Sequence, residues 1–214
     1  MCLYGGKSPE SFSNALPVPE GQPIAPGIAI NEAASCPFPA HQRGAILDSL
    51  RKKGTLNTEE LLTVAALNSW KLVIGRFDQV LTKLSEEQLQ KQIAPGRNRL
   101  FYLLGHLTAV HDRMLPLLGI GERLHPELDE AYITNPDRAL PDPVSASDLK
   151  KAWTEINTRL TAAFEGFTAT EWLQKHASVS EEDFVKDPSR NRLAVVIGRT
   201  NHVSFHSGQA VLAR

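Results

Sequence analysis

The sequence predicts an all-α protein, a four-helix bundle preceded by an irregular, proline-rich N-terminal extension. From residue 46 onward, apolar residues recur at the three- and four-residue spacing of amphipathic helices, and no alternation typical of strands competes with it. Helix-start signals open four long segments of this kind. One long connection, residues 119–144, separates the second segment from the third. Four long amphipathic helices with one crossover connection are typical of a helical bundle.

The composition of the chain changes near residue 45. Residues 1–45 hold seven of the fourteen prolines but only five charged residues: Lys7, Glu10, Glu20, Glu32 and Arg43. Prolines at this density prevent both helix and central strand, whereas a disordered segment usually carries more charge. We therefore expect residues 1–45 to be extended and to pack against the helical body or against a second copy in a homodimer. The bundle domain is expected over residues 46–214.

The first long helix is expected from Thr58 to about Leu84. Asn57 offers a capping side chain before an acidic first turn. Ser85, with a glutamine three residues later, predicts a second capping box and a short helical turn. The apolar positions that support the long helix are Leu61, Val64, Leu67, Leu72, Phe77 and Leu81.

The second long helix is expected to begin at Pro95–Asn98 and to end or kink at Pro116. Its apolar face consists of Leu100, Leu103, Leu107, Val110 and Met114. Residues 119–144 contain four prolines, and connections of this length are uncommon in compact domains unless they are functional or partly helical. We expect this connection to shape the substrate pocket.

The third long helix is expected after the cap Ser145, and a short helix carrying Trp172 is expected after the cap Thr168. The last long helix runs from about Asn191 to the C-terminus. The apolar stripe of the third helix is Leu149, Trp153, Ile156, Leu160 and Phe164, and the three tryptophans are expected in the core. The phrase PGRNRL at residues 95–100 returns as PSRNRL at residues 188–193, which indicates two helix starts that dock in similar ways.

Charge and hydropathy exclude several classes of partner. The chain has 23 Lys and Arg residues against 24 Asp and Glu residues, so it lacks the basic footprint of a nucleic-acid-binding protein. No apolar run approaches the roughly 18 residues of a membrane span, and the N-terminus lacks the pattern of a secretory signal. The two cysteines, Cys2 and Cys36, cannot staple a fold of this size. We therefore expect a cytoplasmic protein without nucleic-acid or membrane partners.

The last long helix carries the most informative pair of side chains, His202 and His206. Residues four apart share one helix face, with Cβ atoms about 5–6 Å apart, so both imidazoles can reach one metal ion. Heptad spacing places Arg199 and Gln209 on the same line of helix positions as the two histidines, beside a line of apolar or small residues. Polar groups at the border of a core need partners. A metal ion is one such partner, and a hydrogen-bonded network through Arg199 and Gln209 is the alternative.

A metal site needs a third protein ligand, and two histidines of the second long helix could supply it. On a helical wheel, His106 lies at the edge of the apolar arc and His111 lies nearer its middle. Spacing does not choose between them, and His111 could equally be a structural histidine near the end of its helix. His41, His125 and His176 are the remaining candidates, of which we expect the latter two to be solvated.

Several phrases of the chain resemble the DinB-like family of metalloenzymes. They are Gly105–Leu107 followed by Asp112, and Asn201–Gln209 with its histidine pair. The phrases at Ala94–Asn98 and Ser180–Phe184 are also similar to that family. The resemblance spans roughly residues 57–214 and leaves the proline-rich extension without a counterpart.

The resemblance implies a bundle with an up-down-down-up arrangement of its helices. It also implies a divalent metal ion held by His106, His202 and His206, with Gln209 as part of the final motif. Zinc is the first choice, and nickel, iron and manganese are alternatives. The commonest form of the family has a second histidine beside the last ligand, where this chain has Phe205.

Family members of known activity resemble transferases that use a low-molecular-weight thiol, such as mycothiol, bacillithiol or glutathione. Three neutral imidazoles leave positions open on a metal ion, and a thiol bound there would lose its proton and serve as a nucleophile. We therefore expect a metal-dependent thiol S-transferase that acts on an electrophilic small molecule. A metal-dependent hydrolase that uses bound hydroxide is one alternative. A non-enzymatic bundle with a structural histidine network is another.

Overall fold

A computed structural model describes residues 57–212 of the chain, so the predicted extension over residues 1–45 lies outside the described residues. The long helices are α2 (Thr58–Lys83), α4 (Leu100–Asp112), α6 (Ala146–Gly166) and α9 (Arg192–Leu212). The short ones are α3 (Glu86–Leu89), α5 (Met114–Leu117), α7 (Ala169–Trp172) and α8 (Glu181–Lys186), with one π-helical turn, η1 (Glu130–Thr134). The predicted all-α class is confirmed for the described part of the chain.

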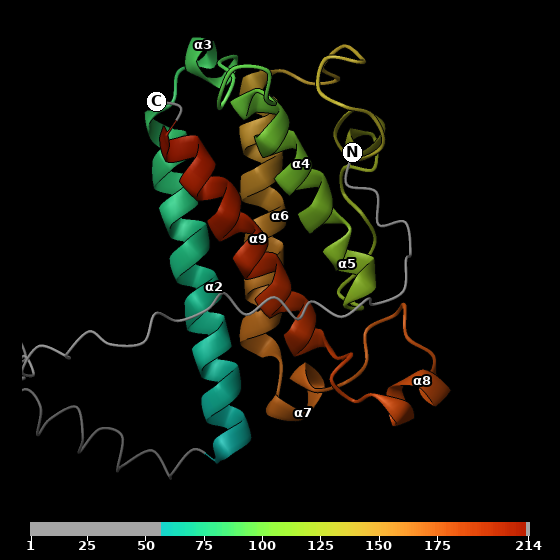
Figure 1. The fold of residues 1–214 in the computed structure, drawn as a ribbon. Helices are drawn as coiled ribbons and strands as arrows, with labels where there is room; N and C mark the ends of the chain where they lie inside the picture. Colours follow the sequence, from blue (N-terminus) through green and yellow to red (C-terminus); the bar gives the residue numbers. More distant parts are fainter. Residues whose placement is uncertain (1–56, 213–214) are drawn as a thin grey trace, which may run out of the picture. The chain divides into compact units, whose positions relative to one another are not determined.

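The four long helices form a bundle with two parallel pairs. In Figure 1, α2 and α9 run upward side by side, whereas α4 and α6 both run downward. α2 packs along α9 and α4 along α6, and smaller contacts join α2 to α6 and α4 to α9. Because α4 and α6 are parallel, residues 118–145 return along the bundle before α6 begins (Figure 1). The predicted up-down-down-up order and the long crossover are confirmed.

Side-chain caps begin the helices where the sequence predicts them. The Asn57 side chain accepts the backbone N–H of Glu60 at 2.9 Å, and the Glu60 carboxylate accepts the N–H of Asn57 at 2.8 Å. The same reciprocal box opens α3 at Ser85 and α7 at Thr168, and the Ser145 hydroxyl caps α6. These bonds satisfy N–H groups that have no partner within the helix.

The second long helix begins later than predicted and is interrupted before Pro116, as predicted. It begins at Leu100, because residues 95–98 form a turn in which Gly96 takes a left-handed conformation with φ of 72°. It ends at Asp112, four residues before Pro116, whose missing N–H cannot donate to the Asp112 carbonyl. An isolated bridge, Gln92 with Arg99, precedes α4, and a second bridge, Lys175 with Asn191, precedes α9. The repeated phrase therefore marks two similar helix entries, as predicted.

Aromatic side chains fill the core of the bundle. Trp70, Trp153 and Trp172 are buried, as predicted, and so is the whole predicted stripe of α6. The indole N–H of Trp70 donates to Thr161 at 2.9 Å, and that of Trp153 donates to Asp78 at 2.7 Å. A buried indole without such an acceptor would leave its N–H unsatisfied.

The predicted apolar stripe of α2 is only partly correct. Leu61, Val64 and Leu72 are exposed by 54, 43 and 53%. The buried face of α2 follows Trp70, Ile74, Phe77, Val80 and Leu81 instead. At about 100° per residue, Leu61 and Leu72 lie on the opposite side of the helix from Trp70. Apolar residues occur on both sides of α2, so spacing alone does not select the side that packs.

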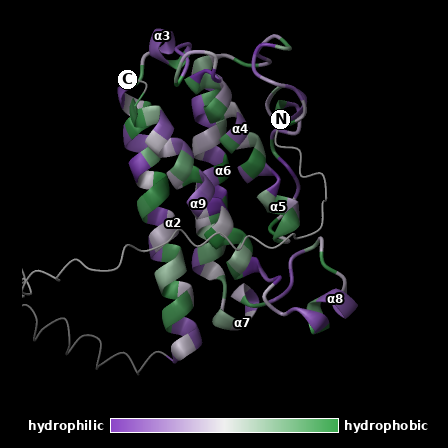
Figure 2. Cartoon of the chain, viewed as in Figure 1, coloured by the Kyte–Doolittle hydropathy of each residue, from purple (hydrophilic) through white to green (hydrophobic). Residues whose placement is uncertain are grey.

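Figure 2 shows the long helices alternating between hydrophobic and hydrophilic residues along their length, whereas α3 and α8 are mainly hydrophilic. This alternation is typical of helices with one face in a core and one in water. Among the helices of residues 57–212, none combines the length and the apolar character that crossing a membrane requires.

The buried carboxylate of Asp112 fixes the first part of the long connection to the end of α4. It accepts the backbone N–H groups of Leu124 at 2.8 Å and His125 at 3.1 Å, and Nε of Arg123 at 2.9 Å. Arg123 also donates to Asp129, which lies next to η1. The connection is therefore bound to α4 by charge-assisted hydrogen bonds, which are stronger than neutral ones.

The second part of the connection is fixed to the start of α4 by Arg99. Its guanidinium is nearly buried and donates to Asp137 and Asp142 at 2.6–3.0 Å. Burial by itself lowers the pKa of Arg99, but the hydrogen bonds and charges of the two carboxylates outweigh it and raise that pKa. The crossover is thus bound at both of its ends to one helix.

We expect Asp112→Ala to lower the free energy of unfolding by about 3 kcal/mol, because it leaves Arg123 short of a carboxylate and two N–H groups without an acceptor. Urea unfolding followed by circular dichroism measures the change. Glu182→Ala is the control, since it removes an exposed carboxylate paired with Lys186 and should change the value by less than about 0.5 kcal/mol. Equal stabilities of the two variants would contradict the role assigned to Asp112.

Candidate metal centre

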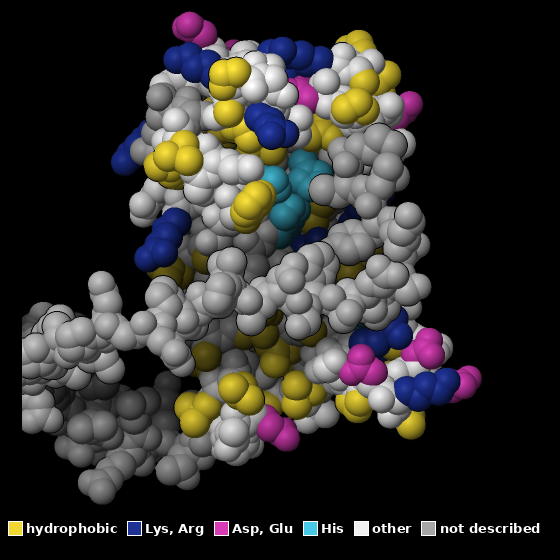
Figure 3. All heavy atoms as spheres, viewed as in Figure 1, with side chains coloured by type: hydrophobic (Ala, Val, Ile, Leu, Met, Phe, Trp, Pro, Cys, Tyr) yellow, Lys and Arg dark blue, Asp and Glu magenta, His cyan; other side chains and the backbone are white. Residues whose placement is uncertain are grey.

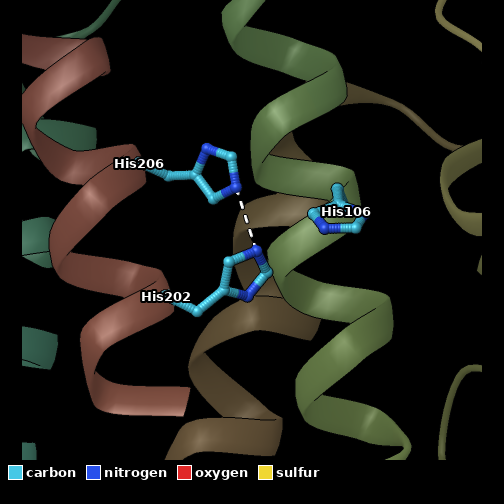
Figure 4. Close-up of side chains that lie close together, drawn as sticks. All are labelled: His106, His202 and His206. Atoms are coloured by element: carbon cyan, nitrogen blue, oxygen red, sulfur yellow. Dashed lines mark hydrogen bonds between the residues drawn. The ribbon is translucent and has the colours of Figure 1, made fainter. Parts of the chain in front are cut away.

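Histidines from α4 and α9 meet at one place on the bundle. His106, His202 and His206 each offer a ring nitrogen, and these atoms all lie within 4.8 Å of one another. The ring centroids are 5.1 Å apart for His106 and His202, 5.7 Å for His106 and His206, and 4.6 Å for His202 and His206. Figure 4 shows the two α9 rings directed toward α4. The structure therefore brings together the three residues that the family resemblance implied.

Hydrogen-bond acceptors orient two of the three rings. Nδ1 of His106 lies 2.9 Å from the backbone carbonyl oxygen of Tyr132, and Nδ1 of His206 lies 2.7 Å from Oε1 of Gln209. A carbonyl oxygen cannot donate, so each Nδ1 carries the proton and each Nε2 keeps its lone pair. Such acceptors hold metal-binding imidazoles in one tautomer and one orientation.

The spacing within the histidine pair fits a shared ion. Nε2 of His206 lies 3.0 Å from Nε2 of His202 (Figure 4), a few tenths of an ångström less than the roughly 3.4 Å between two nitrogens that bind one tetrahedral zinc ion. Nδ1 of His202 is buried and has no hydrogen-bond partner in the described part of the chain, so nothing there fixes the tautomer of this third ring. The three histidines could hold a metal ion.

Burial keeps these imidazoles neutral at physiological pH. Burial, together with smaller contributions from the neighbouring His206 and His106, lowers the pKa of His202 to about 4. Burial also lowers the pKa values of His106 and His206, and the positive charge of Arg199 adds to this effect at His106. An imidazole binds a metal ion only in its neutral form, so the cluster is in its binding form without any loss of protons.

His111, the alternative third ligand, lies in the core and does not belong to the cluster. Its fully buried ring lies between Trp70 and Trp153, with ring centroids 5.1 and 5.0 Å away. Its Nδ1 lies 2.8 Å from Oδ1 of Asn157. His111 is therefore a structural histidine, which is the alternative to a metal ligand that the sequence analysis left open for it.

The other candidates lie elsewhere. His125 is a quarter exposed between two glutamates and His176 is partly exposed, so both are in part solvated and neither belongs to the cluster. His41 lies outside the described residues. Gln209 contacts His206 as the network alternative predicts, but Arg199 makes no hydrogen bond to the cluster in the described part of the chain. It lies one turn before His202 and is half-buried.

Tyr132, a residue of the long connection, holds the ring of His106 in place, and nothing in the sequence indicated this role. Its carbonyl accepts the His106 proton, and its ring covers Gly105 so closely that a Cβ there would lie 2.6 Å from ring atoms. The glycine is therefore required for the approach of η1 to α4. Tyr102 supports the same turn, because its hydroxyl donates to the carbonyl of Asn135 at 2.8 Å. The Gly105–His106 pair was visible in the sequence, but its partner 26 residues later was not.

Comparison with known proteins identifies the family. The model of the DinB superfamily matches residues 69–210, which include all three histidines of the cluster. The chain belongs to the DinB superfamily. The predicted resemblance is thereby confirmed.

A solved structure supports the fold of this DinB-superfamily chain. The crystal structure of a conserved protein from Enterococcus faecalis superposes with a TM-score of 0.50 at 16% sequence identity. The match covers 71% of this chain and 94% of that one. At this identity the likeness concerns the fold alone. No curated protein matches the sequence.

We expect Gly105→Ala to weaken metal binding by this DinB-superfamily protein by about 10- to 100-fold, the loss typical of removing an outer partner of a ligand. The added methyl group displaces Tyr132 and with it the carbonyl that orients His106. Gly75→Ala is the matched control, since a Cβ there meets nothing within 4 Å. Competition with a zinc-binding dye measures the affinity, after circular dichroism has shown that both variants are helical. Equal affinities of the two variants would refute the role of Tyr132.

Acid should destabilise the metal-free protein through His111. Burial lowers the pKa of His111 to about 3, whereas the unfolded chain takes up this proton near pH 6.5. Between these values the unfolded state binds more protons, so the free energy of unfolding decreases as the pH falls, by up to about 1.4 kcal/mol per pH unit for this group. Urea unfolding at pH 7, 6 and 5 measures the slope. His111→Phe should reduce it; an unchanged slope in that variant would contradict the assignment.

Proposed function

We propose that this protein is a metal-dependent enzyme that transfers a low-molecular-weight thiol to an electrophilic small molecule. The observation that carries the proposal is the convergence of His106, His202 and His206 as three neutral ligands. Structural zinc sites are closed by four protein ligands, whereas catalytic sites have three and keep a position open. Within residues 57–212, no cysteine or carboxylate joins the group as a fourth ligand.

The position of the cluster supports access by a small molecule. The three histidines are half-buried, and Figure 3 shows histidine side chains reaching the surface of the face that it draws. A fully buried cluster would exclude substrate, and a fully exposed one would leave the imidazoles free to rotate. Tyr132 and Gln209 hold two of the rings in place before any ligand arrives.

The chemistry of the ligands favours a thiol as the second substrate. A metal ion bound by three neutral imidazoles would keep its full charge, lower the pKa of a coordinated thiol and hold the thiolate for attack. A free thiol with a pKa of about 8.5 is only a few per cent ionised at neutral pH. The sequence has two cysteines, both before residue 40, so the bundle supplies no thiol nucleophile of its own. Zinc suits imidazole and thiolate ligands together, with nickel, iron and manganese as alternatives.

Metal content and thiol dependence test this function together. Protein purified without an affinity tag should contain one metal ion per chain, His206→Ala should lose it, and His125→Ala should keep it. The parent should conjugate 1-chloro-2,4-dinitrobenzene to mycothiol, bacillithiol or glutathione, and chelation should abolish the reaction.

The outcomes separate the alternatives. Metal retained in full by His206→Ala would overturn the site, and absence of metal from the parent would favour a structural histidine network. Metal-dependent hydrolysis of an activated ester without any thiol would assign the same cluster to a hydrolase that uses bound hydroxide.

A further inference from the structure

Arg199 carries a positive charge that no acidic group balances in the described part of the chain. It is half-buried on α9, and within residues 57–212 it has neither an ion pair nor a hydrogen bond from its side chain. Burial, with no compensating carboxylate, lowers the pKa of Arg199. Removing a guanidinium from water without a partner is unfavourable. The presence of a half-buried arginine at this position therefore needs an explanation.

Of the other buried or half-buried arginines among the described residues, two face carboxylates, and Arg192 instead donates to the carbonyl of Glu171 and lies over the ring of Phe167. Arg99 faces Asp137 and Asp142, and Arg123 faces Asp112 and Asp129. Each of these two arginines fixes the long connection to α4. Arg199 makes no comparable link, so a structural role of the same kind does not explain it.

The unbalanced charge lines a cavity. A hollow of about 420 Å³ is bordered by Arg199 together with Arg113, Pro116, Leu117, Ala177 and Ser178. Arg113 is already paired with Asp129 at 2.7 Å, and no acidic residue is among those that line the hollow. Arg199 therefore presents the unpaired charge of this cavity, whose size is within the range of small-molecule sites.

The same arginine is close to the histidine cluster. It precedes His202 by three residues, which places the two side chains on adjacent turns of one helix face. Its charge also lowers the pKa values of His106 and His202. None of the three histidines lines the hollow itself, so a ligand bound at the cluster would reach Arg199 with a second group by extending about one helical turn along α9.

We propose that Arg199 binds a carboxylate of the molecule that reaches the histidine cluster, so that the protein selects an anionic ligand. The inference rests on the proposed function and narrows its substrate class. A guanidinium and a carboxylate form two parallel hydrogen bonds, which position a ligand as well as hold it. No other cation lining the cavity is free to do this.

The proposal distinguishes the candidate thiols by whether they carry a carboxylate. Glutathione and bacillithiol carry carboxylates, whereas mycothiol carries none. In glutathione, the glycine carboxylate follows the cysteine by one residue, within the roughly 7 Å that two extended residues span. Arg199 and His202 are about 4.5 Å apart along the helix axis, so sulfur at the cluster and carboxylate at the arginine are compatible. A carboxylate on the electrophile would use the same arginine.

Calorimetric titration of the full-length, zinc-loaded protein tests the inference. The probes are glutathione, its diethyl ester, which lacks the carboxylate charges, and succinate, which lacks sulfur. The parent should bind glutathione about tenfold or more tightly than the ester. Arg199→Gln should abolish this preference and Arg199→Lys should keep part of it. Arg159→Gln, which removes an exposed arginine from α6, should leave it unchanged.

The arms of the experiment give distinct outcomes. Tighter binding of glutathione than of its ester, lost in Arg199→Gln, supports the proposal with the thiol as the source of the carboxylate. Equal binding of acid and ester, together with succinate binding that depends on Arg199, supports it with the electrophile as the source. If neither ligand depends on Arg199, the proposal is overturned. The succinate titration is repeated on metal-free protein, so failure of the metal site itself is recognised separately.

Discussion

The candidate site depends on how the long connection is bound to α4. Asp112 at one end of that helix and Arg99 at the other each form charge-assisted hydrogen bonds with residues of the connection. A segment of this length gains little from secondary structure of its own, and ordering it costs conformational entropy. The two networks offset that cost. Between them, η1 lies against α4, and the Tyr132 carbonyl reaches His106.

The connection also explains why a glycine precedes the α4 histidine. The ring of Tyr132 covers Gly105, and its backbone accepts the proton of His106. Tyr132 thus determines both how closely the connection approaches α4 and which tautomer His106 has. The two effects are inseparable, because any side chain at Gly105 that moves the ring also moves the carbonyl.

The bundle places the histidines where burial and access are balanced. α9 contacts α4 along one edge of the bundle, and the three histidines lie half-buried at that edge. This depth lowers their pKa values enough to keep them neutral, while ring nitrogens remain within reach of a small molecule. His111, five residues further along α4, is fully buried between two tryptophans and has no such access. The same residue type on the same helix is therefore a candidate ligand at one position and a core residue at the other.

The sequence by itself determined what depends on neighbours within about four residues. Caps such as Asn57 and Ser145 are local hydrogen bonds, and the pairing of His202 with His206 follows from helical geometry alone. Helical spacing left His106 and His111 open as the third histidine, and the family resemblance favoured His106. The partner carbonyl of Tyr132, the unbalanced charge of Arg199 and the buried side of α2 were decided only by the tertiary structure. Each of these depends on which helix faces are docked together, and periodicity cannot supply that when apolar residues occupy more than one side. Docking joins residues 26 to about 100 positions apart, and its outcome is set by the packing of whole helices and by the two charged networks that hold the connection in place.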